Sequence, residues 1–145
     1  MDNSLKGNIG ELKAAMFFME HGYTVFTEMV CDNSPIDLII VKGDNMLRIQ
    51  CKATHPYGKT TDVLRVDTIR KSSRYGYSKK YEPGDMDYVT IYDTDSDQLY
   101  IVDADEFLRV QEFRLRLVAP KNGQKKGVTL AADYLAEDVI KDMGV

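Results

Sequence analysis

The sequence SPIDLIIVKGDNMLRIQCKA, at residues 34–53, decides the fold. Two apolar runs flank a Lys-Gly-Asp-Asn turn, a pattern typical of a buried β-hairpin with strands over residues 36–41 and 46–52. Asp37 interrupts the first run, and Gln50 and Lys52 stand near the end of the second. An acid, an amide and an amine so close to the most apolar part of the chain call for a reason other than packing.

The turn predicts how the two strands pair. A two-residue loop and a four-residue loop give the same register, in which Asp37 lies opposite Gln50. Directly opposed residues project to one face, and Lys52 shares that face because side chains alternate along a strand. Carboxylate and amide oxygens bind hard divalent cations, and a lysine beside them can position water or stabilise charge on phosphorus. A structural Asp–Lys ion pair, with Gln50 as hydrogen-bond partner, explains the same trio.

A fourth candidate, Glu11, lies on a predicted N-terminal helix over residues 5–20, capped by Asn3 or Ser4. Glu11 falls at the margin of the buried face, beside two alanines, and the preceding GNIG sequence would let the helix approach a sheet closely. A surface glutamate in the first turns of a helix is the alternative. The expected buried stripe follows the spacing of the large apolar residues: Leu5, Ile9, Leu12, Met16 and Met19.

The remaining pattern predicts an α/β domain with a mixed central sheet. We expect further strands over residues 23–29, 87–92, 98–102 and 113–118, a short helix from the cap Asp103 through residue 108, and a closing helix over 130–143. The polar stretch 53–83 has no clear assignment. A chain of 145 residues is expected to form a single domain over residues 1–145.

Composition places the chain among soluble globular proteins, with 43% apolar and 29% charged residues. No apolar run approaches the roughly 20 residues that cross a bilayer, and the N-terminus lacks a signal-peptide pattern. Cys31 and Cys51 have neither metal-ligand spacing nor an argument for a disulfide. We therefore expect a cytoplasmic protein with reduced thiols and no membrane partner.

Charge is distributed unevenly along the chain. The net charge is −4, yet residues 65–80 and residues 113–127 each carry +5, so the remainder carries −14. Local fields decide where a polyanion docks, and the average hides both basic segments. Two solvated surface loops are the alternative interpretation.

The motifs together resemble the PD-(D/E)XK nuclease superfamily, and within it the group I intron-associated homing endonucleases. The matching features are a GNIGE helix, the EHGYTVF strand, the acid in IDLII, the RIQCK strand and the MDYVTIYD strand, over roughly residues 5–105. The resemblance implies a restriction-endonuclease-like core, Mg2+ as cofactor and hydrolysis of phosphodiester bonds in double-stranded DNA.

By this resemblance the catalytic residues are Glu11, Asp37, Gln50 and Lys52, and the metal ligands are Glu11, Asp37, Gln50 and the backbone carbonyl of Cys51. Two positions depart from the superfamily pattern. Pro35 stands two residues before the acid rather than next to it. Gln50 stands where most members have Glu or Asp, which removes a negative charge from the metal site. The intron-associated subset resembles this chain in having the glutamine, whereas elsewhere the change would mark an inactive nuclease.

The resemblance implies that two segments, near residues 54–83 and 113–127, contact DNA. They contain the two basic stretches described above. The residues expected to contact DNA are Arg65, Arg70, Lys71, Arg74, Tyr75, Tyr77, Lys79, Lys80, Arg114, Arg116, Lys121, Lys125 and Lys126. One site per chain implies a homodimer or homotetramer for a double-strand break. A Holliday-junction resolvase or repair nuclease on the same fold and a catalytically silent DNA-binding module are the alternatives.

Overall fold

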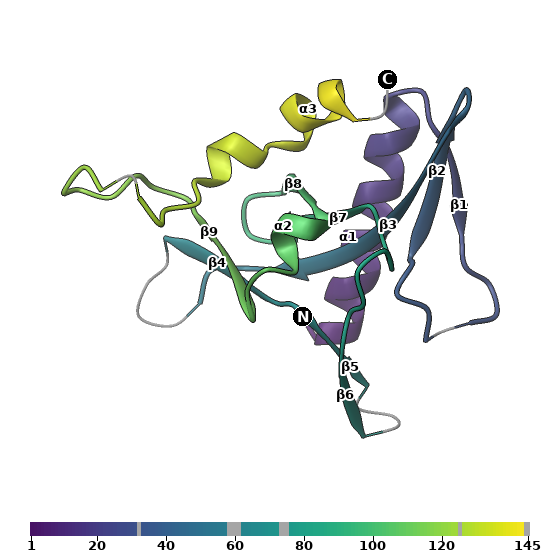
Figure 1. Cartoon of the computed structure of the whole chain (residues 1–145), viewed down its shortest axis with the longest axis horizontal. Helices are drawn as coiled ribbons and strands as arrows, with labels where there is room; N and C mark the ends of the chain where they lie inside the picture. The colour runs from purple at the N-terminus through teal and green to yellow at the C-terminus, as the bar shows by residue number, and fades with distance from the viewer. Residues whose placement is uncertain (32, 58–61, 73–75, 125, 144–145) are drawn as a thin grey trace.

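A five-stranded sheet lies at the centre of the computed structural model, which describes residues 1–31, 33–57, 62–72, 76–124 and 126–143 (Figure 1). Its strand order is β1-β2-β3-β7-β8. The strands are β1 (Thr24–Thr27), β2 (Leu38–Lys42), β3 (Asn45–Thr54), β7 (Tyr88–Asp93) and β8 (Gln98–Asp103). β3 and β7 are parallel and the other neighbours antiparallel, so the predicted mixed sheet is confirmed.

The hairpin of β2 and β3 has the predicted register. Leu38 pairs with Ile49 and Ile40 with Leu47, the alignment that the turn predicts for the two strands. Gly43 in the turn has a φ of 61°, a conformation that glycine adopts without steric cost. Leu38, Ile40 and Ile49 are buried in one core cluster, so the predicted division into an apolar and a polar face is correct.

Helix α1 (Asn3–Glu20) crosses β3 and packs on the sheet through a narrow stripe of residues (Figure 1). Its buried residues are Gly10, Ala14 and Phe18. A Cβ atom at Gly10 would lie 2.9 Å from the Cβ of Ala53 in β3, so the helix backbone is close to the strand. The expected close approach of helix and sheet is therefore present.

Two predictions about this helix are wrong. Asp2 is the cap, and its carboxylate accepts a 2.8 Å hydrogen bond from the Leu5 amide, while Asn3 and Ser4 belong to the first turn. The expected stripe of large apolar residues is not buried, because the helix instead buries the narrow stripe of Gly10, Ala14 and Phe18 and leaves the other long side chains at its flanks. The exposed members are Leu5, Leu12, Met16 and Met19, with Ile9 partly buried.

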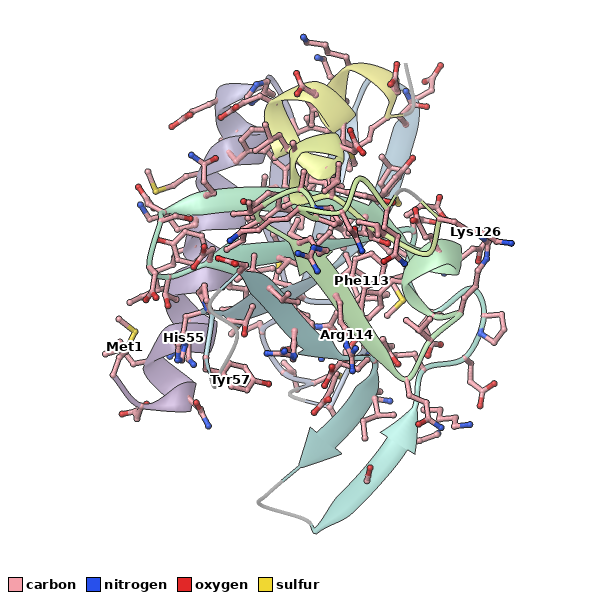
Figure 2. All side chains as sticks on the ribbon, turned by 90° about the vertical axis from the view of Figure 1, so that its left-hand side faces the viewer. Met1, His55, Tyr57, Phe113, Arg114 and Lys126 are labelled. Atoms are coloured by element: carbon pink, nitrogen blue, oxygen red, sulfur yellow. The ribbon has the colours of Figure 1, made fainter. Side chains whose placement is uncertain are left out.

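The stretch that the sequence left unassigned forms strands. These are β4 (Val63–Asp67), β5 (Ile69–Ser72) and β6 (Tyr77–Lys80). β5 and β6 pair as an antiparallel hairpin that projects from the body in both views, while β4 pairs with β9 (Glu112–Arg116) (Figures 1 and 2). Polar residues interrupt the apolar positions of these short strands, so no periodic signal identifies them.

The C-terminal part differs from the single helix expected over residues 130–143. Leu135 is extended, with φ −55° and ψ 130°, and bridges to Tyr100, which breaks the run. Three short turns result: η1 (Ala131–Tyr134), α3 (Ala136–Val139) and η2 (Ile140–Asp142). The predicted short helix is present as α2 (Ala104–Phe107), with the Asp103 carboxylate accepting from its first amides.

Side chains pack into two core clusters. One includes Phe18, Leu38 and Ile49 and joins α1 to the β2–β3 hairpin. The other includes Leu64 and Leu115 and joins the β4–β9 ribbon to the central sheet. Among the described helices, none has the length and apolar character needed to span a membrane.

Candidate active site

Asp37 and Gln50 meet at one end of the hairpin. The Asp37 amide donates a 2.9 Å hydrogen bond to the Ile49 carbonyl, which holds the backbone of Asp37 against β3 just before β2 begins. The Gln50 carboxamide donates through Nε2 to Asp37 Oδ2, and the Cys51 amide donates to the same oxygen at 2.8 Å. The predicted convergence of acid and amide is therefore present in the structure.

Tyr81 holds the other end of the Gln50 carboxamide. Its hydroxyl donates a 3.0 Å hydrogen bond to Gln50 Oε1, and both side chains are buried, at 8% and 7% exposure. The Lys52 ammonium lies 5.2 Å from the centroid of the Tyr81 ring, so one tyrosine contacts two of the predicted catalytic residues. This role was not predicted, because Tyr81 lies in the unassigned stretch and 31 residues from Gln50.

The electrostatics of the site centre on Asp37. Burial raises the pKa of this carboxyl above its ordinary value. The hydrogen bonds from Cys51 and Gln50 and the charge of Lys52 act in the opposite direction without cancelling the effect of burial. Asp37 is thus an acid whose ionised form is incompletely stabilised by the protein alone, and a cation beside it would supply the missing stabilisation.

Glu11 is half-buried on α1, where it lines a shallow apolar groove with Leu12 and Val25. Burial raises the pKa of Glu11, and the charge of Asp37 raises it further. The two carboxylates are close enough to repel, although Glu11 reaches the site from the helix rather than from the hairpin. The structure therefore places all four predicted residues in one neighbourhood: Gln50 and Lys52 on β3, Asp37 directly before β2, and Glu11 on α1.

Glu28 is an acid of this neighbourhood that was not predicted from the sequence. It follows β1 directly, just beyond the Thr27–Leu38 pair that ends the β1–β2 ladder, and it lines a pocket together with Asp37. Its charge raises the pKa of both Asp37 and Glu11. Glu28 lies in the strand predicted over residues 23–29, so pairing of this strand with the hairpin could have indicated its position. The sequence has no short turn between the two from which the register could be derived.

The chemistry of the donors fits a hard divalent cation. Asp37 and Glu11 offer carboxylate oxygens, Gln50 an amide oxygen, and Cys51 a backbone carbonyl. Within the described ranges, no three His, Cys, Asp or Glu side chains form a metal-binding group by themselves, so the amide and carbonyl oxygens would be needed. In the observed orientation Gln50 turns its nitrogen toward Asp37 and its oxygen toward Tyr81.

Arginines from both basic segments meet on the β4–β9 ribbon. Arg65 pairs directly with Arg114 across the ladder, and Arg116 lies two residues from Arg114 on the same face. Glu112 accepts a 2.7 Å hydrogen bond from Arg114 Nε and lies 3.8 Å from Arg65 Nε, which reduces their mutual repulsion. These three arginines line an open groove together with Arg109, which the sequence pattern did not indicate.

Most of the other predicted DNA-contacting residues lie on the β5–β6 hairpin and in the loop after β9 (Figure 2). Arg70 is partly buried and Lys79 and Lys80 are exposed on the hairpin, while Lys121 and Lys126 are exposed in the loop. The structure describes only the backbone of Lys71 and Tyr77. The remaining predicted residues, Arg74, Tyr75 and Lys125, lie outside the described part of the chain.

Two comparisons with known proteins find similarity, one in sequence and one in fold. The sequence model of a family described as PD-(D/E)XK endonuclease matches residues 1–137. The fold is similar to that of a bacterial homing endonuclease, I-Ssp6803I, with a TM-score of 0.78 and 22% sequence identity over 97% of this chain and 93% of that chain. At this identity the similarity shows a shared fold. No curated protein matches the sequence.

Proposed function

The chain belongs to the PD-(D/E)XK endonuclease family, and from this premise we propose that it is a metal-dependent, homing-type endonuclease that hydrolyses phosphodiester bonds in duplex DNA. One observation carries the proposal: Asp37 and Gln50 are joined at the end of the hairpin, and Lys52 projects from the same face of β3. The family and the fold support a nuclease, and the arrangement of this trio supports the metal-dependent chemistry.

Asp37, Gln50, Glu11 and the Cys51 carbonyl are the residues that would hold Mg2+. A divalent cation at such a site stabilises negative charge on phosphate oxygens and lowers the pKa of water. The Lys52 ammonium would bind a phosphate oxygen or orient the attacking water, since it lies on the face where Asp37 and Gln50 meet. Burial of Gln50 and the partial burial of Asp37 keep water from screening these charges.

Duplex DNA is the proposed substrate, and the basic strands support it. A two-stranded β-ribbon fits the major groove of B-DNA, where arginine is the commonest reader of guanine. The β4–β9 ribbon carries Arg65, Arg114 and Arg116 on one face, and Figure 2 shows Arg114 on that ribbon beside the projecting β5–β6 hairpin. Lysines of the hairpin would contact phosphates and set the register of the protein on the duplex.

A double-strand break by one site per chain requires two chains, so we propose a homodimer or homotetramer. Light scattering of the purified chain, with and without a duplex, measures this state directly. A protein that stays monomeric on its duplex would be expected to nick one strand.

The test of function is cleavage of a supercoiled plasmid library that carries candidate sites, by the wild type and by Lys52→Ala, in Mg2+ or in EDTA. We expect cutting in Mg2+ alone, and a loss of about 100-fold or more in Lys52→Ala with DNA binding retained. Lys13→Ala is the matched control and should cut normally, because it removes a lysine of α1 that pairs with Asp97. Cutting that is insensitive to EDTA or to the Lys52 change would contradict the proposal.

A catalytically silent DNA-binding module is the second candidate, and the presence of glutamine rather than an acid at position 50 favours it. An amide brings no negative charge to the site, so Gln50 should hold a divalent cation more weakly than a glutamate would. A wild type that binds DNA and cuts neither linear nor branched duplexes would support this candidate, and gain of cutting in Gln50→Glu would identify the glutamine as the cause.

A further inference from the structure

We propose that Tyr81 is a positioning residue whose hydroxyl allows the Gln50 carboxamide to present its oxygen to a metal ion, an inference that rests on the proposed function. The Gln50 side chain is held at both ends. Its nitrogen donates to Asp37 Oδ2, and its oxygen accepts a 3.0 Å hydrogen bond from the Tyr81 hydroxyl. In this orientation the amide oxygen faces the tyrosine rather than the carboxylate.

Metal binding requires the opposite orientation. The oxygen must face Asp37 if the two residues are to share a cation, because an amide nitrogen with two hydrogens has no lone pair to offer. A half-turn of the carboxamide exchanges its oxygen and its nitrogen without moving the rest of the side chain. After this turn the nitrogen faces Tyr81 and needs an acceptor there.

A tyrosine hydroxyl serves both orientations. It donates to the amide oxygen in the observed state and accepts from the amide nitrogen after the half-turn. Gln50 and Tyr81 are both buried, so water has little access to replace this partner. A donor-only group such as a lysine at this position would bind the oxygen and oppose the turn.

The surroundings fix the hydroxyl where Gln50 needs it. Tyr81 directly follows β6 and packs in one core cluster with Met86 and Val89. Val89 is paired with Gln50 in the parallel β3–β7 ladder, so the tyrosine is anchored beside the residue that it orients. The ring also lies under the Lys52 ammonium, and Tyr81→Phe retains that ring while removing only the hydroxyl.

A glutamate at position 50 would not need this device. The two oxygens of a carboxylate are equivalent, so either one can face the cation whatever the other contacts. We therefore expect the Tyr81 hydroxyl to matter for metal binding when residue 50 is glutamine and to matter little when it is glutamate. A purely structural role for the hydroxyl would act equally in both backgrounds.

The experiment measures Mn2+ affinity by calorimetry for four full-length proteins: the wild type, Tyr81→Phe, Gln50→Glu and the double variant. We expect Tyr81→Phe to weaken Mn2+ binding about tenfold in the wild-type background, as loss of an outer-shell partner does, and less than about twofold in the Gln50→Glu background. Tyr134→Phe is the matched control, because it removes a hydroxyl that bonds Glu106 elsewhere in the fold. It should leave Mn2+ affinity unchanged.

Equal losses in both backgrounds, or no loss in either, would overturn the inference while leaving the proposed function in place, provided that the wild type binds Mn2+ and cuts DNA. Absence of Mn2+ binding and of cutting in both the wild type and Gln50→Glu would instead overturn the metal-dependent function, and the inference with it.

A measurement on the wild type covers the case in which Tyr81→Phe fails to fold. The side-chain NH2 signals of Gln50, assigned by their absence in Gln50→Glu, are followed by NMR during titration with Mg2+. We expect them to shift at saturation, because their acceptor changes from a carboxylate to a phenol oxygen. Signals that keep their position at saturating Mg2+ would overturn the proposal.

Discussion

The Asp37 carboxylate accepts hydrogen bonds from the Gln50 carboxamide and from the Cys51 backbone amide on a single oxygen, Oδ2. An acid between two neutral donors gains less than it would from a cation, and burial still raises its pKa. The contact between Asp37 and Gln50 therefore contains a negative charge that the protein does not fully compensate. The stability of the fold should then depend on the protonation state of Asp37.

Asp37→Asn should stabilise the metal-free protein at neutral pH. The pKa of Asp37 is raised in the folded chain, so between the ordinary carboxyl pKa and the raised value the folded state holds more protons than the unfolded state. The free energy of unfolding therefore falls as pH rises through this window, and the loss persists above it. Asparagine carries no charge and keeps an oxygen acceptor for both donors.

Thermal unfolding in EDTA, from about pH 3 to about pH 8, checks this prediction. The melting temperature of Asp37→Asn should exceed that of the wild type at the upper end of the range, and the two should converge at the lower end. Glu20→Gln, an exposed acid-to-amide change, is the control. A lower melting temperature for Asp37→Asn than for the wild type at neutral pH would contradict the prediction, because it would show that the ionised carboxylate stabilises the fold.

The hairpin and its register were predictable because both depend on local rules. Two apolar runs and a short turn fix the pairing, and alternation then fixes the face on which Gln50 and Lys52 lie. Tyr81 was not predictable, since its hydrogen bond to Gln50 depends on the path of the chain through three short strands that the sequence pattern does not identify. Contacts across such a distance in sequence leave no periodic trace.

The buried face of α1 shows a different limit. Hydrophobic periodicity gives weight to large apolar residues, and Leu12 and Met16 dominate the pattern, yet close packing on a sheet selects Gly10 and Ala14. The GNIG sequence carried the correct signal in its small residues.

Gly10→Ala should destabilise the protein, by about 1–3 kcal/mol, because the new Cβ would lie 2.9 Å from the Cβ of Ala53 and force α1 away from β3. Gly7→Ala is the matched control on the same helix. Nothing lies within 4 Å of a Cβ at Gly7, so alanine should stabilise the protein by about 0.5–1 kcal/mol through helix propensity alone. Urea unfolding measures both changes, and an increase in stability for Gly10→Ala would contradict the close contact.

Arg114→Ala and Arg116→Ala should each weaken DNA binding. Each arginine brings a positive charge to the duplex and releases bound counterions, so the slope of log affinity against log salt concentration should decrease in magnitude by about one per substitution. Fluorescence anisotropy with a labelled duplex, across a salt series, gives the slope. Lys141→Ala, which removes an exposed lysine near the C-terminus, should leave it unchanged. An unchanged affinity and an unchanged slope in both variants would exclude these two arginines from the DNA interface.

Asp87→Asn should destabilise the protein and remove part of its acid sensitivity. The Asp87 carboxylate accepts hydrogen bonds from the Arg48 amide at 2.7 Å and from Arg48 Nη2 at 3.0 Å, which joins β3 to the residue that precedes β7. The Arg48 guanidinium holds the pKa of Asp87 below its ordinary value. This stabilisation is present above the unfolded-state pKa and is lost as pH falls through the folded-state pKa, the opposite sign to Asp37.

Loss of the charged hydrogen bonds should cost about 1–3 kcal/mol at neutral pH, measured by urea unfolding. The acid limb of the stability profile should become shallower in the variant. If Asp87→Asn has the same free energy of unfolding as the wild type at every pH, the charge of Asp87 contributes nothing to stability.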